Sequence, residues 1–209
     1  MKLYDCTTAP SPRRVRIFLA EKQVSLPTIQ VDMRNGEQYS DAFRNINPRC
    51  TVPVLELDDG SHLSEVLAIC WYIDRCFPQN PLFGNDPAEE ARVVMWNAIC
   101  EQEGVYAVAE AFRNRAAGLK GRALTGPHGY AQIEALAQRG RTRVERFMVD
   151  LDERLAQSRF VAGDNFSMAD ITALVAIDFA GWIKLQVPAT HTHLAAWYGV
   201  VSERPGASA

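Results

Sequence analysis

The chain has 209 residues, of which 47% are hydrophobic, with 22 basic and 25 acidic side chains and a formal net charge of −3. That length allows one large domain or two small ones. The mildly acidic balance argues against nucleic acid and anionic membranes as partners. No apolar run approaches the roughly 18 residues of a membrane-spanning helix, and the first residues do not read as a secretory leader. We therefore expect a cytoplasmic protein.

Cysteine and histidine provide no pattern for a disulfide core or a metal centre. The five cysteines are an odd number and form no Cys-x-x-Cys pair. The four histidines show no His-x-x-x-His spacing. Disulfide-stapled and zinc-dependent classes therefore fit poorly, and we expect no metal site.

The first 77 residues alternate between strand and helix patterns. Short apolar runs bounded by turn residues predict four strands, at residues 2–6, 29–31, 52–57 and 62–63. Ser11 is placed as an N-cap with Pro12 as the first residue of a helix, and a second helix is predicted over residues 66–77. This order predicts an α/β domain with one parallel strand pair and an antiparallel hairpin.

A segment rich in Pro, Gly and Asn, residues 78–87, separates this part from a region with no strand pattern. Apolar stripes at helical spacing predict helices over residues 88–112, 133–156, 168–185 and 194–201. The polar, Gly-rich residues 116–129 are predicted to form a loop. We therefore expect domains at 1–77 and 88–209, the second of them all-helical, joined by a linker at 78–87.

Ser167 and Asp170 have the spacing of a capping box, with an almost wholly apolar helix after them. A serine nucleophile with the aspartate behind it would need a histidine, which the motif lacks. We interpret the motif as a helix start that supports the core.

The order of these parts resembles that of the soluble glutathione S-transferases, in which a thioredoxin-like domain precedes a helical one. The resemblance covers the whole chain and is carried by residues 11–17, 52–55, 63–69, 160–171 and 183–188. Within the family, the chain is similar to a fungal and bacterial branch with Tyr-Asp-x-x-x-Ala-Pro near its start. The resemblance implies a homodimer that uses glutathione and a small electrophile, without a metal or redox cofactor.

The resemblance also implies where glutathione binds. Val52 would pair through its backbone with the cysteinyl residue, because the following Pro53 is cis in the family. Glu65 stands where the family has an acid for the γ-glutamyl ammonium, although a first-turn acid is an ordinary feature of a helix. Val66 replaces a usual serine and leaves only its backbone N–H for the γ-glutamyl carboxylate. Arg49 is either a partner of the glycyl carboxylate or a solvated loop charge.

The group that activates the thiol is not the family's usual one. Ala9 stands where several classes have serine or cysteine, and Tyr4 alternates to the wrong face of its strand for the tyrosine of others. The N-terminus of the helix near Ser11 would then stabilise the thiolate, helped by the Ser11 hydroxyl, a nearby threonine or water. Arg113 and Asn114 would reach across the cleft to the same sulfur.

The second substrate is expected between the two domains. Placement suggests that its pocket is lined by Ala9, Pro10, Tyr106 and Phe112. The function indicated is conjugation of glutathione to a small electrophile. Two alternatives stay open: a binding module without catalysis, favoured by Ala9 and Val66, and a thiol–disulfide reductase that would use Cys6.

Overall fold

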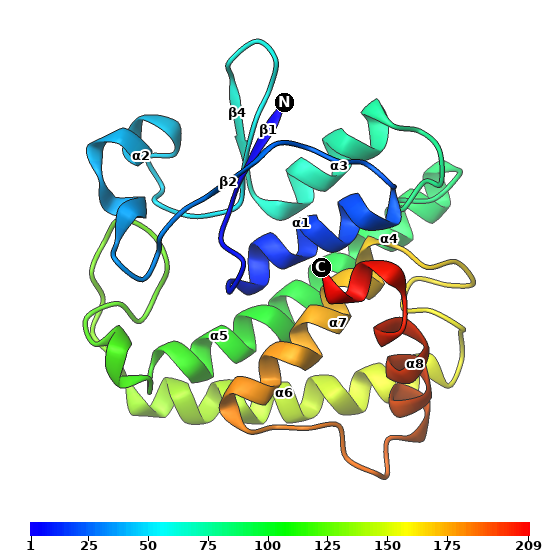
Figure 1. The fold of residues 1–209 in the computed structure, drawn as a ribbon. Coiled ribbons are helices and arrows are strands. Elements are labelled where there is room, and N and C mark those ends of the chain that lie inside the picture. The colour runs from blue at the N-terminus through cyan, green and yellow to red at the C-terminus, as the bar shows by residue number, and fades with distance from the viewer.

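The computed structural model describes all 209 residues (Figure 1). The strands are β1 (Lys2–Asp5), β2 (Thr28–Gln30), β3 (Val54–Glu56) and β4 (His62–Ser64). The α-helices are α1 (Pro10–Glu21), α2 (Asp41–Ile46), α3 (Val66–Cys76), α4 (Pro87–Ile99), α5 (Tyr106–Arg113), α6 (Glu134–Leu155), α7 (Met168–Ala180) and α8 (Thr192–Ser202). Residues 2–76 form an α/β unit, and residues 87–208 form a helical unit.

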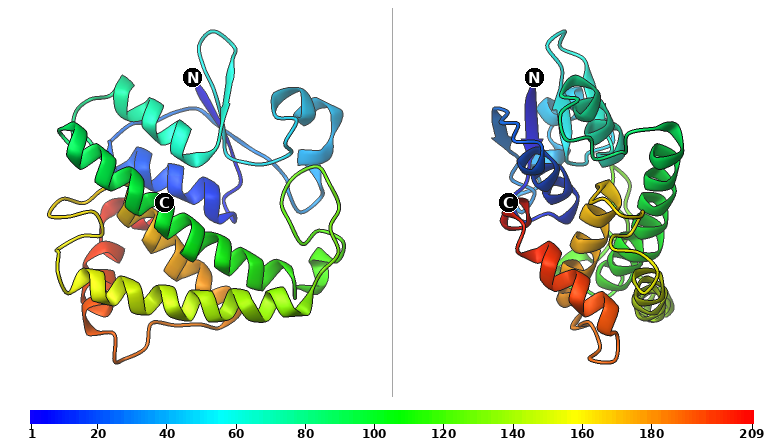
Figure 2. Two further views of the ribbon diagram at one scale, coloured as in Figure 1. Left: turned by 180° about the vertical axis from the view of Figure 1, so that it is seen from behind. Right: turned by 90° about the vertical axis from the view of Figure 1, so that its right-hand side faces the viewer.

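The sheet has the order β2-β1-β3-β4, in which β1 and β2 are parallel and the other pairs are antiparallel. Leu3 and Leu55 belong to the main core together with Phe18 of α1 and Ile69 of α3. The neighbouring residues of these strands belong to a separate small cluster with Phe43 of α2. The predicted mixed α/β fold is therefore confirmed, with helices on both faces of the sheet (Figure 2).

Two parts of the α/β unit differ from the prediction. The third strand begins at Val54 rather than Val52, because Pro53 has no N–H to donate to the ladder. The connection between β2 and β3, for which no helix was predicted, contains α2, which Ser40 caps by accepting a hydrogen bond from the Phe43 N–H at 3.2 Å. This helix is only six residues long, too short for an apolar period to reveal it.

The helix predicted over residues 88–112 is interrupted. A π-helical turn, Cys100–Val105, joins α4 to α5. Gly104 within it packs so closely that an added Cβ would stand 2.9 Å from the Ala176 Cβ and 2.9 Å from a ring carbon of Phe147. The turn thus brings α5 into close contact with α6 and α7, which periodicity alone does not indicate.

The remaining helices follow the prediction with one shortening. α6 matches its expected bounds, but α7 ends at Ala180 and gives way to a 3-10 turn, Gly181–Ile183, before Lys184 adopts a left-handed φ of 59°. Every residue of α7 except Asp178 is buried. The capping box at its start is present as predicted, and Asp170 accepts hydrogen bonds from the Ser167 N–H and hydroxyl. None of the helices is both long and apolar enough to cross a bilayer.

Candidate functional site

The N-terminus of α1 lies at the junction of the two units and lacks a side-chain cap. The N-cap is Ala9 and the helix begins at Pro10, so the prediction of Ser11 as N-cap is wrong. Proline is favoured at the first helical position, and Pro10 starts the helix two residues earlier than Pro12 would. Because Pro10 and Pro12 have no N–H, the Ser11 amide is the free donor of this first turn, and it has no partner in the protein.

Side-chain hydrogen bonds from Arg16 of α1 fix the turn that precedes this helix. Arg16 donates a hydrogen bond to the buried Asp5 carboxylate at 2.6 Å and to the Thr7 carbonyl at 3.0 Å. The Cys6 sulfur lies 3.5 Å from the Thr8 hydroxyl and has no disulfide partner. The free Ser11 amide therefore sits beside a fixed backbone loop.

A second feature of the site is the peptide bond between Val52 and Pro53, which is cis as expected. Val52 is buried, yet neither its N–H nor its C=O makes a hydrogen bond within the protein. Buried backbone groups are nearly always paired, so these two mark a place where another chain or ligand is needed.

The N-terminus of α3 forms a third feature. Glu65 is its N-cap, with φ 72° and ψ 125°, a conformation that residues with a side chain rarely adopt. No side chain caps this helix, and its first backbone hydrogen bond runs from the Ile69 N–H to the Glu65 carbonyl. Val66 turns its side chain into the core, and its N–H makes no hydrogen bond in the protein, as at other helix N-termini that bind anions. Arg49 Nε lies 3.7 Å from a Glu65 carboxylate oxygen, and both side chains are exposed.

A partly buried ion pair joins the two units beside these helix starts. The Arg14 guanidinium donates to Glu101 at 2.6 Å, and its other terminal nitrogen lies 3.4 Å from the Ser11 hydroxyl. Burial raises the pKa of Tyr106, and the charges of Glu101 and Glu65 raise it further. Tyr106 is thus close to the start of α3, although it belongs to the helical unit.

Aromatic side chains of the helical unit face the turn before α1 across a small cavity. Phe112 packs against Phe179 and Trp182, with ring centroids 6.0 and 5.3 Å away. The last two, together with Ala9 and Pro10, line a cavity of about 70 Å³ between the turn before α1 and α7. Of the four residues predicted for this pocket, Ala9 and Pro10 line the cavity, Phe112 contacts two of its lining residues, and Tyr106 is not among the lining residues. Sequence reasoning missed Phe179 and Trp182, because they fall in a helix that was read wholly as core.

Two predicted catalytic residues lie elsewhere. Asn114 is buried, donates to the Glu110 carbonyl at 2.9 Å and accepts from the Ile133 N–H at 2.9 Å. Arg113 donates to the carbonyls of Arg122 and Leu124. Both side chains are therefore committed to the loop between α5 and α6 and do not extend across the cleft, which corrects that expectation.

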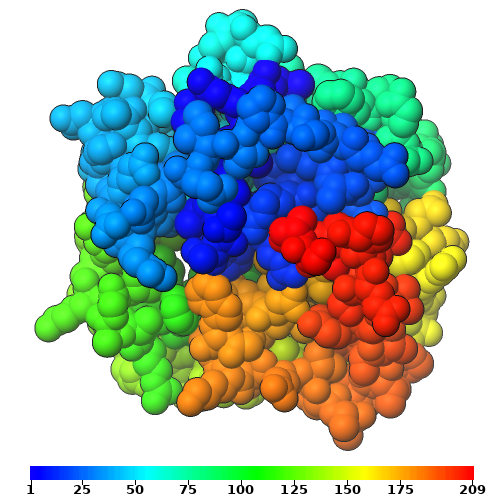
Figure 3. Space-filling view, in the orientation of Figure 1, coloured from blue at the N-terminus to red at the C-terminus, as the bar shows by residue number.

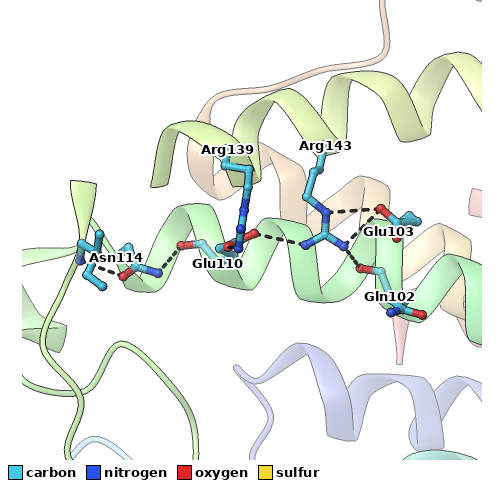
Figure 4. A network of polar contacts seen from close by, with 7 residues as sticks. Gln102, Glu103, Glu110, Asn114, Arg139 and Arg143 are labelled. Atoms are coloured by element: carbon cyan, nitrogen blue, oxygen red, sulfur yellow. Dashed lines mark hydrogen bonds and ion pairs between the residues drawn. The ribbon is translucent and has the colours of Figure 1, made fainter. Parts of the chain in front are cut away.

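The helices on either side of this loop are joined by charged side chains (Figure 4). Arg139 and Arg143 of α6 both bind the Glu110 carboxylate, and Arg143 also binds the Glu103 carboxylate and the Gln102 carbonyl. Because these contacts fix α6 against α5, the loop leaves and re-enters the bundle at defined points.

Tyr4 is directed away from the helix starts, as expected from strand alternation. Its hydroxyl donates to Glu56 at 2.9 Å, and Glu56 pairs with Lys2 at the opposite end of β1 from the turn. No group of three or more His, Cys, Asp or Glu side chains is placed to hold a metal ion.

A mixed four-stranded sheet with a cis-proline before its third strand, joined to a helical unit across the start of α1, defines the glutathione transferase fold. Sequence comparison agrees. The profile of the glutathione S-transferase N-terminal domain matches residues 8–76, and that of the C-terminal domain matches residues 102–205. The chain is 38% identical to glutathione S-transferase 2 of Saccharomyces cerevisiae, over 98% of this chain and 87% of that one.

Solved structures show the same relationship. A glutathione S-transferase domain-containing protein of Marinobacter aquaeolei aligns with a TM-score of 0.91 at 38% identity, over 99% of this chain and 100% of that one. Gtt2 of Saccharomyces cerevisiae aligns with a TM-score of 0.90 at 37% identity, over 100% and 99% of the two chains. The protein belongs to the glutathione S-transferase family and is an enzyme of that family.

Proposed function

We propose that this protein conjugates the thiol of reduced glutathione to small electrophiles. The observation that carries the proposal is the unpaired backbone of Val52, which lies between two uncapped helix N-termini. An extended peptide can pair with the Val52 N–H and C=O as an added strand would. The start of α3 would take the γ-glutamyl carboxylate, because its free amides and helix dipole favour an anion. Glu65 would meet the γ-glutamyl ammonium.

The start of α1 would then stabilise the glutathione thiolate. A helix N-terminus lowers the pKa of a thiol, and the Ser11 N–H and hydroxyl are the donors available beside Ala9. The Arg14 guanidinium donates a hydrogen bond to the Ser11 hydroxyl oxygen. The hydroxyl proton therefore points away from Arg14 and is free to be donated to the thiolate. The thiol proton leaves to water, the thiolate forms a sulfur–carbon bond with the electrophile, and the leaving group departs with its electron pair. This chemistry requires no metal or redox cofactor.

The electrophile would bind against the aromatic wall. Phe112, Phe179 and Trp182 offer flat apolar contacts beside Ala9 and Pro10. Tyr106, which lies near Glu65 and Arg14, would contact the electrophile from the start of α5. Arrangement of the two reactants in one cleft supplies most of the rate enhancement that such a reaction needs.

A cytoplasmic homodimer is the proposed form of the enzyme. Large apolar side chains on α3 and α4 are between 36% and 49% exposed, namely Trp71, Val94, Met95 and Ile99. A second copy of the chain would cover this face, because burial of apolar area is the usual basis of a stable homodimer. Light scattering coupled to size exclusion should give twice the chain mass for the wild type and one chain mass for Met95→Asp.

A thermal-shift titration with glutathione and a turnover assay with an activated aryl halide test the function together. Glutathione at 100 times its Kd should stabilise the fold by about 2.7 kcal/mol. A matched titration with oxidised glutathione and with a γ-glutamyl-free dipeptide shows whether both ends of the ligand are read. Binding without turnover over a panel of electrophiles would contradict the transferase and favour a binding module.

A further inference from the structure

A cavity of about 590 Å³ lies at the opposite end of α1 from Ala9. Glu21, the last residue of α1, belongs to its wall, and a helix of 12 residues places it about 18 Å from the helix start. The other walls come from the linker, the first turns of α4, the end of α6, the loop before α7 and Arg204. Because the cavity includes neither the residues around Ala9 nor Val52 and Glu65, it is a separate site.

Contacts within the protein fix the walls of this cavity. The Met168 N–H donates to the Leu82 carbonyl at 2.9 Å, which joins the start of α7 to the linker. The Lys22 ammonium donates to the Gln79 and Asn80 carbonyls, which joins the linker to α1. Figure 1 shows these segments at the right-hand edge of the molecule, the right-hand view of Figure 2 faces that edge, and Figure 3 shows the loop before α7 (yellow) beside the C-terminal turn (red). The cavity is therefore pre-formed, as small-molecule sites usually are.

The lining of the cavity is polar, since only four of its 17 residues are hydrophobic. Two of its three carboxylates are already engaged. Glu21 accepts two hydrogen bonds from the Arg204 guanidinium, at 2.6 and 3.1 Å. Glu89 accepts from the N–H and the side-chain amide of Asn85, at 2.7 and 3.0 Å. The third carboxylate, Asp164, is exposed and forms no ion pair, so it remains available as an acceptor.

Two arginines of the lining have no carboxylate partner. The Arg154 guanidinium lies over the ring of Trp96, 5.0 Å from its centroid, and its Nε donates to the Val161 carbonyl at 2.9 Å. The two terminal nitrogens of Arg154 make no hydrogen bond in the protein. Arg92 is exposed and precedes Trp96 by one turn of α4, so both arginines neighbour the same indole. Two positive charges therefore lie together in the cavity without an ion pair.

We propose that this cavity binds a sugar phosphate, with the phosphate group between Arg92 and Arg154. A phosphate monoester carries a charge of about −1.5 to −2 at pH 7, which matches two guanidinium groups. Each guanidinium can donate two parallel N–H bonds to phosphate oxygens. The Asp164 carboxylate and the Asn165 amide, both in the lining, pair with hydroxyl groups of the sugar. This binding does not depend on the proposed conjugation reaction.

The lining favours a sugar over other groups that carry a phosphate. The volume lies within the range of about 300–1,000 Å³ that is usual for organic ligands, and is much larger than inorganic phosphate needs. A nucleotide base needs an open aromatic face on which to stack. Phe166 is the aromatic residue of the lining, but Arg204 lies 3.9 Å from the centroid of its ring and Phe160 packs against it at 5.9 Å. The free polar side chains suit hydroxyl groups instead.

Isothermal titration with glucose 6-phosphate, ribose 5-phosphate, glucose and inorganic phosphate tests this inference. The wild type should bind a sugar phosphate at least about tenfold more tightly than glucose or inorganic phosphate, because each of these lacks one part of the contacts. Arg92→Gln and Arg154→Gln should each weaken that binding about tenfold, as expected for the loss of one charge-assisted contact. Arg154 also binds the Val161 carbonyl, so thermal unfolding must show that its variant is folded. Arg92→Gln breaks no hydrogen bond and keeps the test valid in either case.

Arg159→Gln is the matched control, since it removes the same charge close to Arg154 in the chain, at an exposed position outside the lining. It should leave the affinity for the sugar phosphate unchanged. Wild-type protein that binds neither sugar phosphate would overturn the inference, and so would equal affinity in the wild type and Arg92→Gln. Saturating glutathione should not displace the sugar phosphate. Displacement would place the ligand in the groove at Val52 and would also overturn the inference.

Discussion

Gly140 is the position where a single methyl group should disturb both the fold and the site. It lies in α6 where this helix crosses α5, and the two backbones touch there. A Cβ at this position would stand 2.6 Å from the Ala111 nitrogen and 2.8 Å from the Ala107 oxygen. Both are main-chain atoms, which cannot rotate aside as the end of a side chain can. Gly140→Ala must therefore push α6 away from α5.

The size of the effect follows from two opposing contributions. Alanine in place of glycine within an open helix stabilises by about 1 kcal/mol. Overpacking of a tight contact costs about 1–3 kcal/mol, and contact with backbone atoms belongs at the upper end of that range. We therefore expect Gly140→Ala to lower the free energy of unfolding by about 2 kcal/mol. For a chain of this length that corresponds to a fall in Tm of about 4–8 °C.

Gly199 provides the matched control. It lies exposed in α8, and an added Cβ would meet no atom within 4 Å. Gly199→Ala should gain up to about 1 kcal/mol from helix propensity alone. Urea unfolding followed by circular dichroism measures both variants. Shifts of the same sign in the two would refute the steric argument. Because α5 carries Tyr106 and Phe112, Gly140→Ala should also raise the KM for the electrophile, which Gly199→Ala should leave unchanged.

Four further changes test other parts of the structure. Glu65→Gly should raise stability by about 1 kcal/mol, because the positive φ is no longer strained, while titration should show weaker glutathione binding. Burial raises the pKa of Asp170 to about 6. The pKa of an aspartate in the unfolded chain is near 4, so the stabilisation from Asp170 is present below pH 4 and is lost as the pH rises through 6. The stability advantage of the wild type over Asp170→Asn, measured by urea unfolding, should therefore shrink by up to about 3 kcal/mol from pH 4 to 7. A difference that stays constant with pH would contradict this sign. Lys22→Met should cost about 3–5 kcal/mol in urea unfolding, because it leaves the buried Asp74 carboxylate without its cation, and adding Asp74→Leu should recover most of the loss. Cys6→Ala should keep full conjugation activity, since the buried thiol has no second cysteine with which to cycle; a loss of thiol–disulfide exchange in that variant would support a reductase instead.

Features that depend on residues close together in the chain could be predicted from the sequence. The capping box of Ser167 and Asp170 was predictable because its members lie three residues apart, and both the Ser167 N–H and the Ser167 hydroxyl donate to the Asp170 carboxylate. The hairpin before β4 and the apolar stripe of α6 follow from turn chemistry and helical period in the same way. The start of α1 was placed wrongly because two prolines compete there, and only the folded chain shows that Pro10 leads.

The tertiary structure decided what depends on distant residues. No local pattern distinguishes Arg13 and Arg14, which are neutralised by carboxylates 165 and 87 residues away, from Arg122, which is not. The close packing of the π-helical turn likewise depends on distant residues, because Gly104 meets Phe147 and Ala176 of other helices. The sequence by itself therefore determined the family, the two kinds of unit and the cis-proline site. Only the tertiary structure decided which arginines stay free to bind a ligand. An arginine is neutralised when the fold brings a carboxylate beside it, and that carboxylate can come from a distant part of the chain.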